Sequence, residues 1–306
     1  MAAHFANVSR LTIVTALLFL SALLFLSAGC GPDPDASSTP QELPAAGGET
    51  AADSTSSSVI RLASTTSTRD SGLFEVLLPV FEKSHNCRVY LIAVGTGSAL
   101  RLGEAGDVDV LVIHAPSAAE AFMKAGHGIR HEAVMHNSFL IVGPAADPAD
   151  VVGSELTPCL KKIKDQGHKF LSRGDDSGTH MRELALWELA GGKPDGKEYL
   201  ETGQGMGPTL VMADEMQAYT LVDQGTWLKQ KEKLELVPIV TEGPDLLNPY
   251  SAIVINPKKS KAINSKLAAA FVDFLISDEA QKLIDGYKVN GQKLFHADRL
   301  NAEIVE

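Results

Sequence analysis

The sequence predicts an α/β protein built around a parallel sheet, and three observations support this fold class. Apolar, strand-like segments at residues 59–63, 89–94 and 108–113 each end in polar or small residues. A helix-like segment follows each of them after a few residues. Strand, polar loop and helix therefore recur three times between residues 59 and 125, as in sheets with crossover helices. Ligands of such sheets bind beyond the carboxyl ends of the strands, so these loops are candidate binding elements.

A second α/β region is predicted between residues 138 and 240. It begins with the apolar strand 138–144 and contains a short strand at 169–171, followed by a helix that includes residues 184–189. Further strands are expected at 218–221, 234–240 and 248–256, and closing helices at 264–276 and 278–286. The interval 127–136, HGIRHEAVMH, is interpreted as a solvent-exposed loop that leads into the strand at 138.

The N-terminal 29 residues have the composition of a targeting segment. Arg10 is the only charged side chain before Asp33 when histidine is neutral, and residues 11–29 carry no charge. Because this apolar run ends in Leu-Ser-Ala-Gly-Cys, we expect a lipoprotein signal peptide at 1–29, cleaved before Cys30 and with lipid attached to the Cys30 thiol. The alternative is an uncleaved membrane anchor. Both place the rest of the chain outside the cytoplasm.

The segment 30–58 is rich in Pro, Ser, Ala, Gly and acidic residues and is expected to be a disordered tether to the folded body. The chain has 27 Lys and Arg against 38 Asp and Glu, a net charge of −11 with neutral histidine. Removal of residues 1–29 takes away only Arg10, which leaves 26 − 38 = −12. Such a charge disfavours nucleic acid and anionic lipid as partners. A site that binds an anion must therefore attract it through contacts close to the ligand, against the negative charge of the whole chain.

Three hydroxyl-rich loops are the candidate binding elements. They are STTST at 64–68, GTGSAL at 95–100 and SRGDDSGTH at 172–180. Each joins a predicted strand to a predicted helix, so its hydroxyls and the free N–H groups of the helix start point to the same space, which suits an anion. Arg173 adds a fixed, planar set of cationic donors. We expect the carboxylates that follow it to orient the guanidinium or to cap the helix.

Catalytic and metal-binding interpretations of these residues are weaker. A serine nucleophile elbow needs Gly-x-Ser-x-Gly, which Ser177 lacks, and the nearby His180 has no evident third partner. Metal ligation by Asp175, Asp176 and His180 is equally weak, and the histidines of the 127–136 segment (His127, His131 and His136) fit no compact zinc pattern. We expect no catalytic residue, no metal and no cofactor. Cys87 and Cys159 are expected to be buried free thiols, with a disulfide as the alternative.

Taken together, the chain resembles the solute-binding proteins of bacterial ABC transporters. Within them it is similar to the type II class, which includes molybdate- and phosphate-binding-like proteins, and it most resembles the tungstate-binding branch of that class. The motifs that carry the resemblance are STTST with 70–73, 93–97 with 99–100, 106–110, 114–116, 142–144, 172–180, 205–207, 218–221 and 247–250. Ser98 and Ser138 depart from the usual pattern of that family.

The resemblance implies a type II periplasmic-binding-protein fold, with two α/β lobes, two hinge crossings and a ligand cleft. Lobe I would comprise 59–137 and 248–306, and lobe II 138–247. Closure of the lobes would bring the donors onto one ligand. The implied donors are Thr65, Thr66, Ser67, Thr96, Gly97 and Ser98 from lobe I and Arg173, Ser177, Gly178 and Thr179 from lobe II. The implied partners are a small oxyanion, an ABC permease and, through Cys30, the membrane. We expect a monomer.

The ligand expected from this resemblance is tungstate, with molybdate left open because the two dianions are nearly the same in size and charge. Both are fully deprotonated near neutral pH, so an ideal site offers donors only. Phosphate keeps a proton and gains from an acceptor. Phosphate-binding proteins share the Arg-x-Asp-x-Ser-Gly-Thr pattern of 173–179 but usually place an Asp before Ala-Pro, where this chain has His114. A sensory receptor for the same anion is the remaining alternative.

Overall fold

A ten-stranded mixed sheet runs through residues 58–300, the part of the chain that the computed structural model describes. The targeting segment, Cys30 and nearly all of the predicted tether lie outside these residues. The strand order is β2-β1-β3-β9-β4-β7-β5-β6, and β8 and β12 also pair with β4. The strands of this sheet are β1 (Ser58–Thr65), β2 (Cys87–Val94), β3 (Val110–Ile113), β4 (Gly128–Gly143), β5 (Phe170–Ser172), β6 (Tyr199–Glu201), β7 (Tyr219–Asp223), β8 (Val237–Val240), β9 (Leu247–Ile255) and β12 (His296–Ala297). Strands β10 (Lys288–Val289) and β11 (Gln292–Lys293) form a separate two-stranded sheet.

The helices fall mostly between these strands, as the α/β pattern predicts. They are α1 (Thr66–Ser71), α2 (Leu73–His85), α3 (Thr96–Ala105), α4 (Pro116–Lys124), α5 (Leu156–Asp165), α6 (Gly178–Leu189), α7 (Met206–Glu215), α8 (Gln224–Gln230), α9 (Ser265–Leu275) and α10 (Asp278–Asp285), with short 3₁₀ turns at Lys231–Lys233 and Pro244–Leu246. Within residues 58–300, none of them combines the length and the apolar character that a membrane-spanning helix needs.

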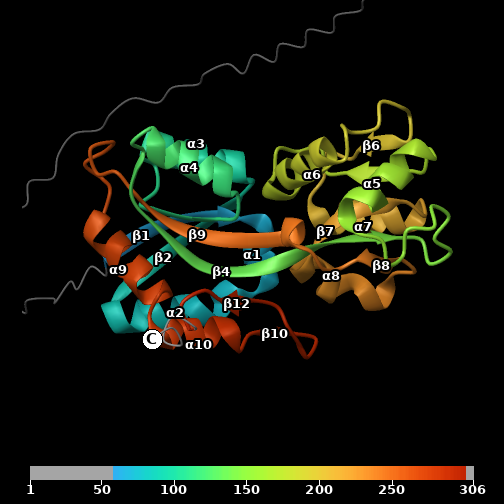
Figure 1. The fold of residues 1–306 in the computed structure, drawn as a ribbon. Coiled ribbons are helices and arrows are strands. Elements are labelled where there is room, and N and C mark those ends of the chain that lie inside the picture. Colours follow the sequence, from blue (N-terminus) through green and yellow to red (C-terminus); the bar gives the residue numbers. More distant parts are fainter. Residues whose placement is uncertain (1–57, 301–306) are drawn as a thin grey trace, which may run out of the picture. The chain divides into compact units, whose positions relative to one another are not determined.

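Two long antiparallel strands connect the parallel parts of the sheet. Strand β1 pairs in parallel with β2 and β3, and β5 pairs in parallel with β6 and β7. Strands β4 and β9 pair from Gly128 to Ser138, and they run side by side through the body in Figure 1. The α/β class is confirmed, although the sheet is mixed and not purely parallel. The division into lobes at 138 and 248 stays a prediction.

The interpretation of residues 127–136 as a loop is wrong. Residues 128–143 form the single strand β4, so the strand expected at 138 begins ten positions earlier. His131 and His136 lie on this strand, and His136 pairs with Pro249 of β9 and His296 of β12. Residues there alternate between exposed and half-buried positions, which is the pattern of a strand with one solvated face. The exposed positions hold Ile129, His131 and Ala133 and the half-buried ones Arg130 and Glu132, so the sequence itself shows no polar–apolar alternation there.

Helices begin directly where the hydroxyl-rich loops were expected. Helix α1 starts at Thr66, immediately after β1, because the Thr65 hydroxyl accepts a hydrogen bond from the Thr68 N–H and caps the helix. Helix α3 likewise starts at Thr96, directly after its N-cap Gly95. The N–H groups of both helix starts therefore lie at the carboxyl ends of β1 and β2.

Three buried apolar clusters hold the sheet and helices together, and they explain the thiols. Phe170, Trp187 and Tyr219 pack in one cluster that also contains Cys159, and Cys87 packs in another. Both cysteines are free and buried, as expected. Burial raises the pKa of the Cys159 thiol to about 12, so this thiol stays protonated and inert at neutral pH.

Candidate anion-binding site

The loop between β5 and α6 places Arg173 by local backbone geometry. Gly174 has φ +60° and lies against Glu201, where a Cβ atom would come within 2.7 Å of the Glu201 Cβ. Asp176 also has positive φ, +54°, which aspartate tolerates better than most residues. These two turns reverse the chain between the strand and the helix. They bring Arg173 and the start of α6 to the same edge of the sheet.

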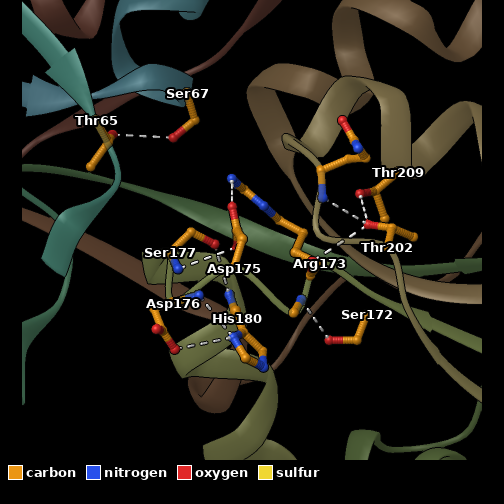
Figure 2. A network of polar contacts seen from close by, with 12 residues as sticks. Thr65, Ser67, Ser172, Arg173, Asp175, Asp176, Ser177, His180, Thr202 and Thr209 are labelled. Atoms are coloured by element: carbon orange, nitrogen blue, oxygen red, sulfur yellow. Dashed lines mark hydrogen bonds and ion pairs between the residues drawn. The ribbon is translucent and has the colours of Figure 1, made fainter. Parts of the chain in front are cut away.

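Asp175 holds the guanidinium in place, as the sequence suggested. Its Oδ2 accepts a hydrogen bond from Arg173 Nη2 at 2.6 Å, and its Oδ1 accepts one from the Ser177 N–H at 3.3 Å. Figure 2 shows the Arg173 side chain extending to Asp175, with Thr65 and Ser67 of the first hydroxyl-rich segment in the same view. Arg173 is only 5% exposed, so its charge is buried and paired. The Asp176 side chain is exposed instead.

The start of α6 touches residues from two other strand ends. A Cβ atom on Gly178 would lie 2.8 Å from His114 Cε1 and 3.1 Å from Thr96 Oγ1. A Cβ atom on Gly97 would lie 3.9 Å from the Asp176 carbonyl oxygen. Only glycine permits the approach at position 178. The segments 95–98 and 172–180 are therefore in contact across the sheet edge, together with His114.

Buried polar atoms without a protein partner concentrate at this junction. Among residues 58–300 they include Thr96 Oγ1, Arg173 Nε, Thr179 Oγ1 and His180 Nε2. Thr96 is fully buried and Thr179 is 1% exposed. An unpaired buried hydroxyl costs about 1–3 kcal/mol, so native proteins rarely keep several together without a reason. A bound group that accepts hydrogen bonds would satisfy donors of this kind.

Some predicted donors are already engaged within the chain. Ser177 caps α6, since its Oγ accepts from the His180 N–H at 3.2 Å. Thr65 Oγ1 is 2.6 Å from Thr68 Oγ1 and 3.2 Å from Ser67 Oγ. Ser98 Oγ accepts from Arg101 Nη2 at 2.8 Å. These hydrogen bonds shape the loops, but the Ser177 and Ser98 oxygens only accept in them, so their O–H groups and the backbone N–H groups beside them remain possible anion contacts.

Thr66 and Ser67 lie on a cavity of about 380 Å³ together with Arg173. The wall opposite α1 is formed by the start of α7, Gly205 to Pro208, and by Gln230 of α8, whose Oε1 is buried without a protein partner. These residues were not among those predicted for the site. A signal was present, because GMG repeats the small-residue helix start of GTGS.

A larger cavity of about 470 Å³ lies beside His114. Its lining is mainly apolar and includes Phe139 and Met181, which does not suit an anion.

His114, whose role the sequence left open, is part of the junction. It is 4% exposed, and its ring stacks on Tyr250 with 4.8 Å between centroids. Burial lowers the pKa of His114, with Arg173 adding a smaller effect in the same direction and Asn248 and Asp223 opposing it. His114 is therefore neutral at pH 7 in this arrangement.

The geometry does not support a serine hydrolase. Ser177 Oγ contacts the backbone N–H of His180, and the His180 ring is turned away, with Nδ1 accepting from the Asp176 N–H at 3.1 Å. A general base must reach the hydroxyl that it deprotonates. Within residues 58–300, no cluster of three or more His, Cys, Asp or Glu side chains is arranged to hold a metal ion.

This sheet, with helix starts gathered at one edge around a buried arginine, is the architecture of an α/β solute-binding protein. A family model described as the PBP superfamily domain matches residues 45–279, and the chain belongs to that superfamily. The chain is 48% identical over 231 residues to the tungstate-binding protein TupA of Peptoclostridium acidaminophilum, an alignment that covers 74% of this chain and 81% of that protein.

Two solved structures are similar over the same region. The tungstate-binding protein TupA of Desulfovibrio alaskensis G20 has a TM-score of 0.72 and 40% identity, with 79% of this chain and all of that chain covered. The crystal structure of the tungstate ABC transporter from Geobacter sulfurreducens has a TM-score of 0.69 and 47% identity, with coverage of 75% and 98%. These neighbours agree with the periplasmic-binding-protein fold expected from the sequence.

Proposed function

We propose that this protein captures tungstate outside the cytoplasm and delivers it to an ABC permease. The observation that carries the proposal is the junction of 95–98, 172–180 and His114, where Thr96, Thr179 and Arg173 keep buried polar atoms without a protein partner. Relatives named for tungstate binding, with 40% and 48% identity, support the choice of ligand.

The predicted site offers donors to a tetrahedral dianion. The N–H groups at the starts of α1, α3 and α6 carry the positive ends of helix dipoles, and the hydroxyls of Thr96 and Thr179 rotate freely to donate. Arg173 supplies a buried cation. Tungstate and molybdate have no proton to donate, so they match donors only. Molybdate is the second ligand of this proposal.

Titration calorimetry with tungstate, molybdate, phosphate and sulfate tests the proposal directly. We expect tungstate to bind more tightly than phosphate and sulfate, since the site supplies no carboxylate acceptor at position 114. Binding of phosphate with no heat from tungstate would contradict it. A phosphate-binding protein is the alternative, because phosphate-binding proteins share the motif of 173–179.

The proposed role is that of a receptor and not of an enzyme. Absence of labelling by a serine-reactive probe, with or without the substitution Ser177→Ala, is the expected result. Lipid attachment at Cys30 and the absence of a cofactor remain parts of the proposal, and so does a monomeric state. Mass spectrometry of the mature protein tests the anchor, and permease and ATPase genes beside this one would favour transport over sensing.

A further inference from the structure

A buried chain of hydrogen bonds connects the two long strands to the candidate site through His114. Asn248 of β9 donates from Nδ2 to Asn137 Oδ1 of β4 at 2.8 Å and to the Tyr250 hydroxyl at 3.2 Å. Its Oδ1 lies 2.9 Å from His114 Nδ1. Because an amide oxygen only accepts, His114 Nδ1 carries the proton. The lone pair of the neutral ring is therefore on Nε2.

That lone pair faces the anion-binding segment. His114 Nε2 lies 3.5 Å from Ser67 Oγ, and Ser67 lines the cavity that also contains Arg173. Beside a neutral imidazole, the Ser67 hydroxyl is drawn to donate toward Nε2 or toward Thr65, which is 3.2 Å away. Its own lone pairs are then left for the cavity. Lone pairs oppose a ligand that has no proton.

Protonation at Nε2 reverses this polarity. An Nε2–H group donates to Ser67 Oγ, so the Ser67 O–H becomes free to donate to a ligand. The imidazolium also adds a positive charge beside a dianion, which favours the charged form of the ring. One proton thus turns an acceptor into a donor and adds an attraction.

The charged groups that face His114 oppose one another, so a bound ligand can decide whether the ring is protonated. On the loop after β5, Arg173 disfavours the imidazolium, but its charge is already paired with Asp175. At the end of β7, Asp223 favours the imidazolium. Tyr250 of β9, stacked on the ring, has a pKa raised by burial and stays neutral. A dianion at the junction is the group that can change this balance.

We propose that the protein takes up one proton at His114 Nε2 as it binds a fully deprotonated oxyanion, an inference that rests on the proposed function. The proton comes from the acid form of the buffer, which is left as its conjugate base. The anion enters unprotonated and loses nothing. The bound state then holds an imidazolium and a dianion in the same buried region.

Calorimetry of sodium tungstate in buffers of different ionisation enthalpy measures the uptake. The slope of observed enthalpy against buffer enthalpy gives the protons taken up, and we expect about one per tungstate for the wild-type protein. The dissociation constant should then rise about tenfold per pH unit between the pKa values of His114 in the free and bound states. In His114→Gln the uptake should vanish. In the matched control His131→Gln, at an exposed position on β4, it should persist.

Two results overturn the inference while leaving tungstate binding intact. One is binding by the wild-type protein without proton uptake, and the other is uptake that persists in His114→Gln, which would assign the proton to another group. Imidazole ¹⁵N chemical shifts of the wild-type protein give an answer even where the variant fails to fold. A neutral His114 ring in the tungstate complex overturns the inference there too. Absence of any tungstate binding by the wild-type protein refutes the proposed function itself.

Discussion

Replacing Thr179 by valine should stabilise the fold and weaken anion capture at the same time. Thr179 is 1% exposed, and its Oγ1 has no protein partner among residues 58–300. Valine has nearly the same shape, so the substitution removes the hydroxyl and little else. At a residue that serves packing alone, the substitution would not raise stability and weaken tungstate binding together.

The expected magnitudes follow from the state of that hydroxyl. An unpaired buried polar group costs about 1–3 kcal/mol, and the free energy of unfolding of the ligand-free variant should rise by about that amount. A hydrogen bond from a neutral donor to a charged group contributes about 1.5–3 kcal/mol. Its loss should raise the dissociation constant for tungstate about 10-fold to 150-fold.

Urea denaturation without ligand and calorimetry with tungstate measure the two effects. Thr209→Val is the matched control, because Thr209 is fully buried but its Oγ1 lies 2.8 Å from Thr202 Oγ1. Loss of that hydrogen bond should destabilise the protein by about 1 kcal/mol and leave a smaller mark on tungstate binding. An unchanged dissociation constant in Thr179→Val, or a less stable variant, would refute the reasoning.

Three further predictions concern the same region. Arg173→Ala should raise the dissociation constant for tungstate at least about a hundredfold, because a buried charge-assisted contact is lost. The control Arg88→Ala, at an exposed position, should leave it unchanged. If Arg173→Ala binds tungstate as tightly as the wild-type protein, Arg173 is not part of the site. Gly178→Ala should weaken binding measured by calorimetry and lower the melting temperature, since its Cβ would lie 2.8 Å from His114 Cε1 and force the buried ring to shift. Unaltered tungstate affinity would show that this close approach is not needed. Burial raises the pKa of Glu183 from 4.5 to about 7, so the folded state holds its proton more tightly than the unfolded state does. Stability should therefore fall by about 3 kcal/mol as pH rises from about 4.5 to 7, and urea denaturation of Glu183→Gln should show that slope removed.

Local chemistry made much of the fold and site predictable. The strand–helix repeats follow from apolar periodicity, and the motif at 172–180 contains the residues that its geometry needs. Gly174 and Asp176 adopt positive φ, Asp175 orients Arg173, and Ser177 caps α6. Each of these interactions spans eight residues or fewer, so the amino-acid order specifies them directly.

What the sequence could not predict depends on contacts between distant segments. The first ten residues of β4 were missed because they pair with β9, more than a hundred residues away, and their polar composition resembled a loop. The approach of Gly178 to His114 and Thr96 has no local signature either. His114 was noted only as a departure from a phosphate pattern, while its place in the chain of Asn248 and Ser67 emerges from the folded arrangement.

The pairing of Arg173 with Asp175 explains how a chain of net charge −11 can be suited to a dianion. Asp175 balances the guanidinium charge before any ligand arrives, so the candidate site does not rely on a long-range positive field that the rest of the molecule would oppose. Exposed carboxylates act through water and salt, which screen them over about 8 Å at physiological ionic strength. Buried hydroxyls and helix-start N–H groups act at contact distance, where that screening is weak. Capture then depends on the number and direction of donors at contact distance, Arg173 among them, and the proton proposed for His114 is a positive charge that arrives with the ligand.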